Sequence, residues 1–173
     1  MKRLQALALG SFVAMVLLTV VHAESRADAV RPLSSFPRER IAIETRSARR
    51  HLFEAWRADT LATRAQGLMF VRDMRADQAM IFVYPSPQFV AMWMKNTLIA
   101  LDMLFVDERG CVVTVHERAE PGSLDSIAAD APVVLVVELA GGTVKTLGIV
   151  TGDRVLRPDA GWPQAPGPCT AGR

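Results

Sequence analysis

The chain has 173 residues, and its 20 Lys and Arg residues are nearly balanced by 18 Asp and Glu residues. Such a small net charge provides no broad positive surface that could bind phosphate groups. We therefore expect neither a nucleic acid partner nor a polybasic membrane contact. The length suits one domain with its own hydrophobic core, and we expect no second domain.

The first 23 residues have the layout of a secretory signal peptide. Lys2 and Arg3 precede an apolar stretch over residues 4–21, and a small-residue site ends at Ala23, directly before Glu24. This order predicts cleavage between Ala23 and Glu24, and a periplasmic or secreted protein with 18 basic and 18 acidic residues. An uncleaved membrane anchor is the alternative, because the apolar stretch approaches the length of a membrane span.

Residues 38–157 are expected to form the folded domain. A polar, proline-containing linker over residues 24–37 precedes it, and a proline-rich tail over residues 158–173 follows it. An oxidising compartment would permit a disulfide between Cys111, in an apolar run, and Cys169, in the tail. The alternative is a buried, inert Cys111 and a disordered Cys169.

The first elements of the domain are a hairpin and a short helix. Apolar segments over residues 41–45 and 51–56 flank a polar stretch, as the two strands of a hairpin do. Asp59 or Thr60 is the expected N-cap of the helix, and Gly67 its C-terminal stop. The residues expected on its packed face are Leu61, Ala65 and Leu68.

Two further hairpins are expected in the middle of the chain. Residues 80–84 and 89–94 flank the turn Pro85-Ser86-Pro87 and are predicted to pair with each other. Residues 101–106 and 111–116 flank Asp107-Glu108-Arg109-Gly110, whose acidic and glycine residues favour a tight turn.

The last elements are a buried strand, a helical turn and a final strand. Residues 133–140 are almost continuously aliphatic, which is typical of a strand buried on both faces. Thr143 is expected to cap a helical turn that ends at Gly148, and a last strand is expected through Val155. About seven short strands and two brief helices predict a mostly β (α+β) fold, a compact β-barrel or a rolled antiparallel or mixed sheet.

Five short motifs relate the chain to a known family. They are Gly67-Leu68-Met69-Phe70, Met80-Ile81-Phe82, Trp93-Met94-Lys95-Asn96-Thr97, Leu101-Asp102 and Glu138-Leu139-Ala140-Gly141. In this order they resemble the DUF192 (UPF0127) family, over residues 49–157. Ala79 and Ala100 depart from the glycine and proline that are usual there. The resemblance implies a small β-rich domain, often exported, with no established reaction.

Asp102 and Glu138 are the charged residues that most need an explanation. Each interrupts a strongly apolar strand, and a buried charge is costly unless it is paired or faces a ligand. Lys95 is the expected partner of Asp102, because it is the nearest basic residue before it in the sequence.

The same region predicts a binding pocket. Polar side chains beside an aromatic wall suit a small polar ligand. The expected lining is Trp93, Lys95, Asn96, Thr97 and Asp102, with Glu138 as a further member. The alternative is an internal network of hydrogen bonds and ion pairs that only fixes the strands.

Two other functions fit parts of the sequence. Asp102 and Glu138 could act as the acid and base of an enzyme acting on an envelope saccharide. Met92 and Met94 could bind Cu(I) through their thioethers in an accessory protein. No nucleophile elbow, zinc motif or phosphate loop is present in the sequence, and His51 and His116 do not suggest a metal site.

We therefore expect an exported binding domain rather than an enzyme. Its partner would be a small polar ligand or an envelope protein that binds through residues 93–102, and no cofactor is expected.

Overall fold

The structure, a computed structural model, describes residues 30–160 and residue 169. The predicted signal peptide and its cleavage site at Ala23 and Glu24 lie outside these residues. Within them, no helix is both long enough and apolar enough to cross a membrane.

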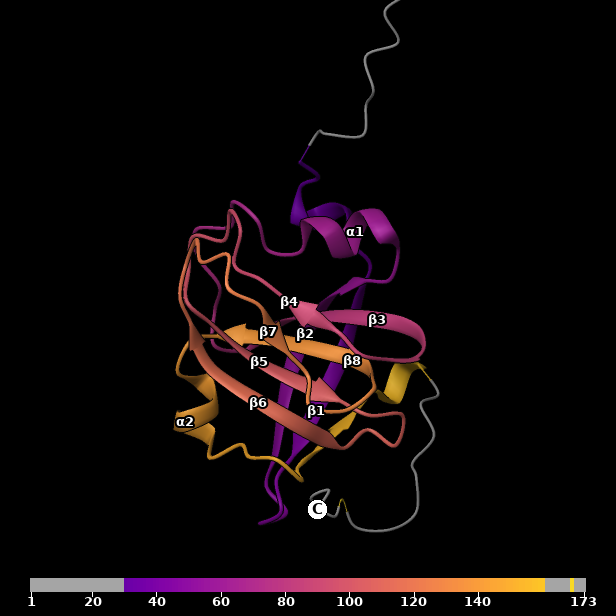
Figure 1. The fold of residues 1–173 in the computed structure, drawn as a ribbon. Helices are drawn as coiled ribbons and strands as arrows, with labels where there is room; N and C mark the ends of the chain where they lie inside the picture. Colours follow the sequence, from indigo (N-terminus) through magenta and orange to yellow (C-terminus); the bar gives the residue numbers. More distant parts are fainter. Residues whose placement is uncertain (1–29, 161–168, 170–173) are drawn as a thin grey trace, which may run out of the picture.

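The domain is built around one curled sheet (Figure 1). The strands of this sheet are β1 (Arg38–Glu44), β2 (Arg50–Ala58), β3 (Gln78–Gln88), β5 (Leu101–Val106), β6 (Val112–Ala119), β8 (Val133–Ala140) and β9 (Arg154–Leu156). A small second sheet pairs β4 (Ala91–Met92) with β7 (Ile127–Ala128). The helices are α1 (Leu61–Gln66) and α2 (Thr143–Leu147), with 3-10 turns η2 (Leu33–Ser35) and η3 (Pro158–Ala160).

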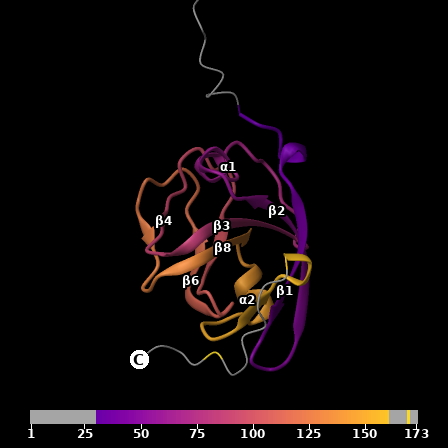
Figure 2. The ribbon, with the colours of Figure 1, turned by 90° about the vertical axis from the view of Figure 1, so that its right-hand side faces the viewer.

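The seven strands have the order β6-β5-β8-β3-β2-β1-β9, and only the β2–β3 pair is parallel. The sheet curls into a half-barrel whose outer strands β6 and β9 approach each other at one end (Figure 2). There the Val112 N–H donates to the Asp153 carbonyl at 2.9 Å, and the Val155 N–H to the Gly110 carbonyl at 2.8 Å. The predicted mostly β fold with two short helices is confirmed.

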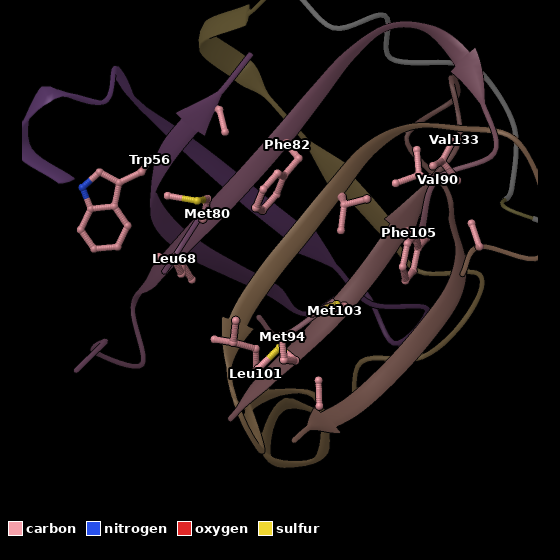
Figure 3. Close-up of a cluster of buried hydrophobic side chains, with 14 of the residues drawn as sticks. Trp56, Leu68, Met80, Phe82, Val90, Met94, Leu101, Met103, Phe105 and Val133 are labelled. Carbon is pink, nitrogen blue, oxygen red and sulfur yellow. The ribbon is translucent and has the colours of Figure 1, made fainter. Parts of the chain in front are cut away.

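Each face of the sheet has its own hydrophobic core, because successive strand residues point to opposite faces. One core contains side chains from β1, β2, β6 and β9 as well as the central strands, so it fills the inside of the curl. The other contains Met103 and Phe105 of β5 and is covered by the chain around Leu68 and Met94 (Figure 3). Because β5 contributes to both cores, all of its residues are buried.

The predicted second hairpin is wrong. β3 continues through Pro85 and Pro87, and β4 pairs with β7 instead of β3. The register between β3 and β8 shifts between Val83 and Gln88, which leaves both prolines in an exposed irregular stretch. Proline cannot donate to a neighbouring strand, but such a stretch does not need that hydrogen bond.

Helix α1 begins and ends as predicted. The Thr63 N–H donates to the Thr60 hydroxyl at 3.1 Å, and the Thr60 N–H to the Thr63 hydroxyl at 3.0 Å. Gly67 ends the helix at a φ of +49°, and a β-carbon there would lie 2.9 Å from the Phe82 ring. Both conditions favour glycine.

Of the three residues predicted to form the packed face of α1, two are not buried. Leu61 is 82% exposed and Ala65 is also exposed, whereas Leu68, just beyond the helix, is buried. The helix is held instead by polar contacts. The Arg64 guanidinium donates to the Val83 carbonyl at 2.9 Å, and the Gln66 amide exchanges two hydrogen bonds with the backbone of Arg31.

Cys111 and Cys169 form a disulfide, with their Cα atoms 5.4 Å apart. Cys111 directly precedes β6, at the place where β6 and β9 approach each other. The disulfide therefore ties Cys169 to the closing end of the half-barrel and decides between the two alternatives that the sequence left open.

The double variant Cys111→Ser/Cys169→Ser should be less stable than the wild-type protein. The bridge spans 58 residues of sequence, and a closed loop of that length reduces the entropy of the unfolded chain. We expect the free energy of unfolding in urea to fall by about 2–4 kcal/mol. Dithiothreitol should reduce the wild-type value by the same amount and leave the variant unchanged; equal stabilities without reductant would contradict this.

Candidate functional site

A pocket of about 260 Å³ opens between α1, the end of β3 and the chain that follows β4. Its walls are mainly aromatic, aliphatic and thioether side chains, and its polar groups come from four separate segments. Its lining includes Arg64, Gln66, Leu68, Met69, Phe82, Tyr84, Met92, Trp93, Lys95, Thr97 and Glu138.

Glu138 is the one carboxylic acid among the lining residues. It lies in the middle of β8, between Met80 of β3 and Met103 of β5, and is only 4% exposed. Its Oε2 atom has no hydrogen-bond partner in the part of the chain that the structure describes. Burial disfavours the charged form and raises the pKa of Glu138 to about 8. At neutral pH the carboxyl is therefore mostly protonated and can donate a hydrogen bond.

Lys95 and Trp93 stand at the rim of the pocket. The Lys95 ammonium lies 5.3 Å from the centre of the Trp93 ring, and both side chains are exposed. No carboxylate forms an ion pair with Lys95 within the described residues. The aromatic face orients the ammonium without neutralising its charge.

Arg64 and Tyr84 form a second cation–aromatic pair. The guanidinium carbon lies 5.1 Å from the centre of the Tyr84 ring, and Nη1 also donates to the Asp59 carbonyl at 2.7 Å. The Tyr84 hydroxyl donates to the Met92 sulfur at 3.9 Å. Burial raises the pKa of Tyr84, against the opposing effect of Arg64, so the hydroxyl stays protonated.

The segment after β4 is hydrogen-bonded to the segment after α1. The Phe70 N–H donates to the Asn96 carbonyl at 2.8 Å, and the Asn96 side-chain amide approaches the Met69 sulfur at 3.8 Å. Phe70 and Asn96 both have positive φ, 64° and 58°. Two tight backbone turns thus bring the residues after Gly67 and those around Lys95 to the same pocket.

Asp102 lies elsewhere. It is fully buried and accepts hydrogen bonds from the backbone N–H groups of Arg118 at 2.8 Å, Gly142 at 2.9 Å and Val144 at 2.8 Å. The expected pairing with Lys95 is wrong. Thr143 is not the N-cap of α2 either: Gly142 occupies that position, and the Asp102 carboxylate from β5 supplies the capping hydrogen bonds.

Asp102 and Glu138 lie on opposite faces of the sheet. Asp102 pairs with Leu139, which belongs to the core inside the curl, whereas Glu138 pairs with Met103, which belongs to the other core. Residues that pair directly across strands share a face, so the two carboxyl groups cannot act on one substrate as acid and base. Of the predicted pocket residues, Trp93, Lys95, Thr97 and Glu138 line the pocket, and Asn96 and Asp102 do not.

Met92 and Met94 also lie in different surroundings. Met92 lines the pocket, whereas Met94 is fully buried in the hydrophobic core with Met80 and Met103 (Figure 3). The second thioether in the pocket is that of Met69. Over residues 30–160 and 169, no group of three or more His, Cys, Asp or Glu residues could hold a metal ion.

Comparison with protein-family models matches residues 42–156 to DUF192, which is described as "Uncharacterized ACR". The chain belongs to the DUF192 family. A search of curated proteins gave no match.

Two solved structures are similar to this DUF192 protein. One, from Sinorhizobium meliloti 1021, is described as a "putative transcription regulator"; it is 42% identical, with a TM-score of 0.70 over 71% of this chain and 95% of that one. The other, a protein of unknown function from Novosphingobium aromaticivorans DSM 12444, is 34% identical, with a TM-score of 0.70 over 74% of this chain and 91% of that one.

Four of the five motifs that relate the sequence to DUF192 contribute to the pocket. They supply Gly67 to Met69, Phe82, Trp93 with Lys95 and Thr97, and Glu138. The motif Leu101-Asp102 instead supports the fold. The sequence analysis did not predict that Arg64, Gln66 and Tyr84 line the pocket. Of these three, only Tyr84 could have been inferred from the sequence, because it closely follows the family motif Met80-Ile81-Phe82.

Asp102→Asn should destabilise the domain. The asparagine amide places a donor where the carboxylate accepts from backbone N–H groups, so at least one buried donor loses its partner. We expect the free energy of unfolding to fall by about 2–4 kcal/mol. The exposed Asp73→Asn variant is the matched control and should change little. Equal urea midpoints for both variants would contradict the capping role.

Glu138→Gln should change how stability depends on pH. Between the ordinary pKa of about 4.5 and the folded value of about 8, the folded protein binds more protons than the unfolded chain. The wild-type protein should therefore lose about 1.4 kcal/mol of unfolding free energy per pH unit in this window, on the order of 4–5 kcal/mol in total.

In Glu138→Gln this loss should be absent, and the exposed Glu117→Gln variant should behave as wild type. Urea unfolding at pH 5, 6, 7 and 8 measures the difference. If the unfolding free energies of the wild type and Glu138→Gln depended on pH in the same way, Glu138 would ionise near its ordinary pKa.

Proposed function

We propose that this chain is an exported DUF192 protein that binds a small polar ligand in the pocket lined by Trp93, Lys95, Thr97 and Glu138. The observation that carries the proposal is the buried Glu138 carboxyl, whose Oε2 atom has no partner in the described structure and which belongs to the pocket lining.

The other buried carboxyl groups in the described residues all have hydrogen-bond or ion-pair partners within the domain. Besides Glu138, the described residues bury Glu39, Asp102 and Asp153. Glu39 forms a two-pronged ion pair with Arg157, at 2.6 and 2.8 Å, and Asp153 accepts from the backbone N–H groups of Arg46 and Val150. An unmatched buried carboxyl is costly, so Glu138 is best explained by a partner that arrives from outside.

The pocket supports binding better than hydrolysis. Glycoside hydrolysis by the common mechanisms needs two carboxyl groups on either side of one bond. Glu138 is the only acid in the lining, and Asp102 faces the opposite side of the sheet. A binding role needs only a few polar groups set in an apolar wall, which this pocket has.

Two observations support export. The first 23 residues have the order of regions found in secretory signal peptides. The Cys111–Cys169 disulfide also suits an oxidising compartment such as the periplasm.

A thermal-shift screen of residues 24–173 tests the binding function. A ligand that binds only the folded protein raises the unfolding temperature, and sugars, nucleotides, amino acids, organic acids and Cu(I) cover the candidate classes. We expect at least one organic compound to give a shift that Lys95→Met abolishes and Lys145→Met retains. Lys145 is a suitable control because it is exposed on α2, outside the pocket lining.

Two outcomes would overturn the proposal. A shift with Cu(I) alone that Met92→Leu abolishes would assign the pocket to copper. No shift with any compound, together with co-purification of an envelope protein lost in Lys95→Met, would assign this surface to a protein partner.

A further inference from the structure

We propose that the ligand is a small organic carboxylate with an apolar body. Its carboxylate accepts hydrogen bonds from the Lys95 ammonium and the Glu138 carboxyl, and its body lies against Trp93, Met69 and Met92. This inference rests on the proposed function, since it names the ligand class of the same pocket.

The charges in the pocket favour an anion. Four titratable groups face it: Arg64 from α1, Tyr84 from β3, Lys95 from the chain after β4, and Glu138 from β8. Neither Arg64 nor Lys95 forms an ion pair with a carboxylate in the described part of the chain. At pH 7 Tyr84 is neutral, and Glu138 is mostly protonated because burial raises its pKa to about 8. The pocket therefore has two positive charges and no negative one.

Most of the polar groups in the pocket are already engaged. The Arg64 guanidinium donates to two backbone carbonyls, the Gln66 amide is bonded to Arg31, and the Thr97 hydroxyl reaches the Lys95 carbonyl at 3.5 Å. Both Arg64 hydrogen bonds use Nη1, so within the described residues Lys95, Glu138 and the remaining N–H groups of Arg64 are the groups with free hydrogen-bonding capacity. A ligand rich in hydroxyl groups, such as a sugar, would have to bury several of them without partners.

The rest of the lining suits an apolar body. Leu68 and Phe82 are buried in the hydrophobic core that also contains Met103 and Phe105, and the thioethers of Met69 and Met92 line the pocket with Trp93. Thioethers adapt to irregular apolar shapes and pack well against aromatic rings. A volume of about 260 Å³ is below the range for drug-sized ligands, so the body is a single ring or a short branched chain.

The test uses matched pairs of an acid and its uncharged amide. Benzoate, phenylacetate and isovalerate are titrated into residues 24–173 by calorimetry at pH 6.5, each beside the amide of the same shape. We expect at least one acid to bind at least about tenfold more tightly than its amide, a difference of about 1.4 kcal/mol. Lys95→Met should remove this preference, and Lys145→Met should keep it.

The pH dependence tests the hydrogen bond from Glu138. With a pKa of about 8, only about a tenth of the Glu138 carboxyl is protonated at pH 9, so the apparent affinity should fall about tenfold between pH 6.5 and pH 9. Glu138→Gln keeps a neutral donor at this place and should remove the fall. An unchanged fall in this variant would show that Glu138 does not bind the anion.

The remaining outcomes separate this inference from the proposed function. If glucose or the amides bind as tightly as the acids, the pocket binds a polar ligand but the carboxylate assignment is wrong. If phenyl phosphate binds more than about tenfold more tightly than all three acids, the ligand is a phosphate ester. If no compound in this panel or in the thermal-shift screen binds, both proposals fail.

Discussion

The Asp102 carboxylate is the interaction on which the arrangement of the domain depends. From the start of β5, which lies next to the edge strand β6, it accepts backbone hydrogen bonds from β6 and from the start of α2, so it joins three separate parts of the chain. Backbone N–H groups near a helix start suit a negative charge, and such hydrogen bonds are stronger than those between neutral groups. Successive side chains of a strand point to opposite faces of the sheet. Because Asp102 points toward α2, Met103 and its cross-strand partner Glu138 point to the opposite face.

Glu138 is therefore the counterpart of Asp102 on the other side of the sheet, but without its partners. The domain satisfies Asp102, Glu39 and Asp153 with its own groups, whereas it leaves an oxygen of Glu138 unmatched beside a pocket. A carboxyl in this state lowers the stability of the folded protein at neutral pH, and binding sites are where proteins commonly retain such a cost. The uncompensated charges of Lys95 and Arg64 on the same pocket agree with that interpretation.

The sequence predicted the elements that depend on local chemistry, including the β1–β2 and β5–β6 hairpins, and missed the pairing of β4 with β7, which are far apart in the sequence. Thr60 and Gly67 mark the ends of α1 because capping involves only nearby residues. Pro85 and Pro87 predicted a turn, yet they lie in β3 because the register shift removes the need for their missing donors. Asp102 was recognised as a residue needing a partner, but its partners are backbone N–H groups, and no side-chain pattern in the sequence marks their positions.

The most direct test of this account is the titration of the Glu138 carboxyl in the ligand-free protein, followed by ¹³C NMR and assigned by comparison with Glu138→Gln. A buried carboxyl with no partner on one oxygen should titrate with a pKa of about 8. A pKa near the ordinary value of about 4.5 would show that Glu138 is solvated or paired. In that case the feature on which both the binding function and the ligand class rest would be absent.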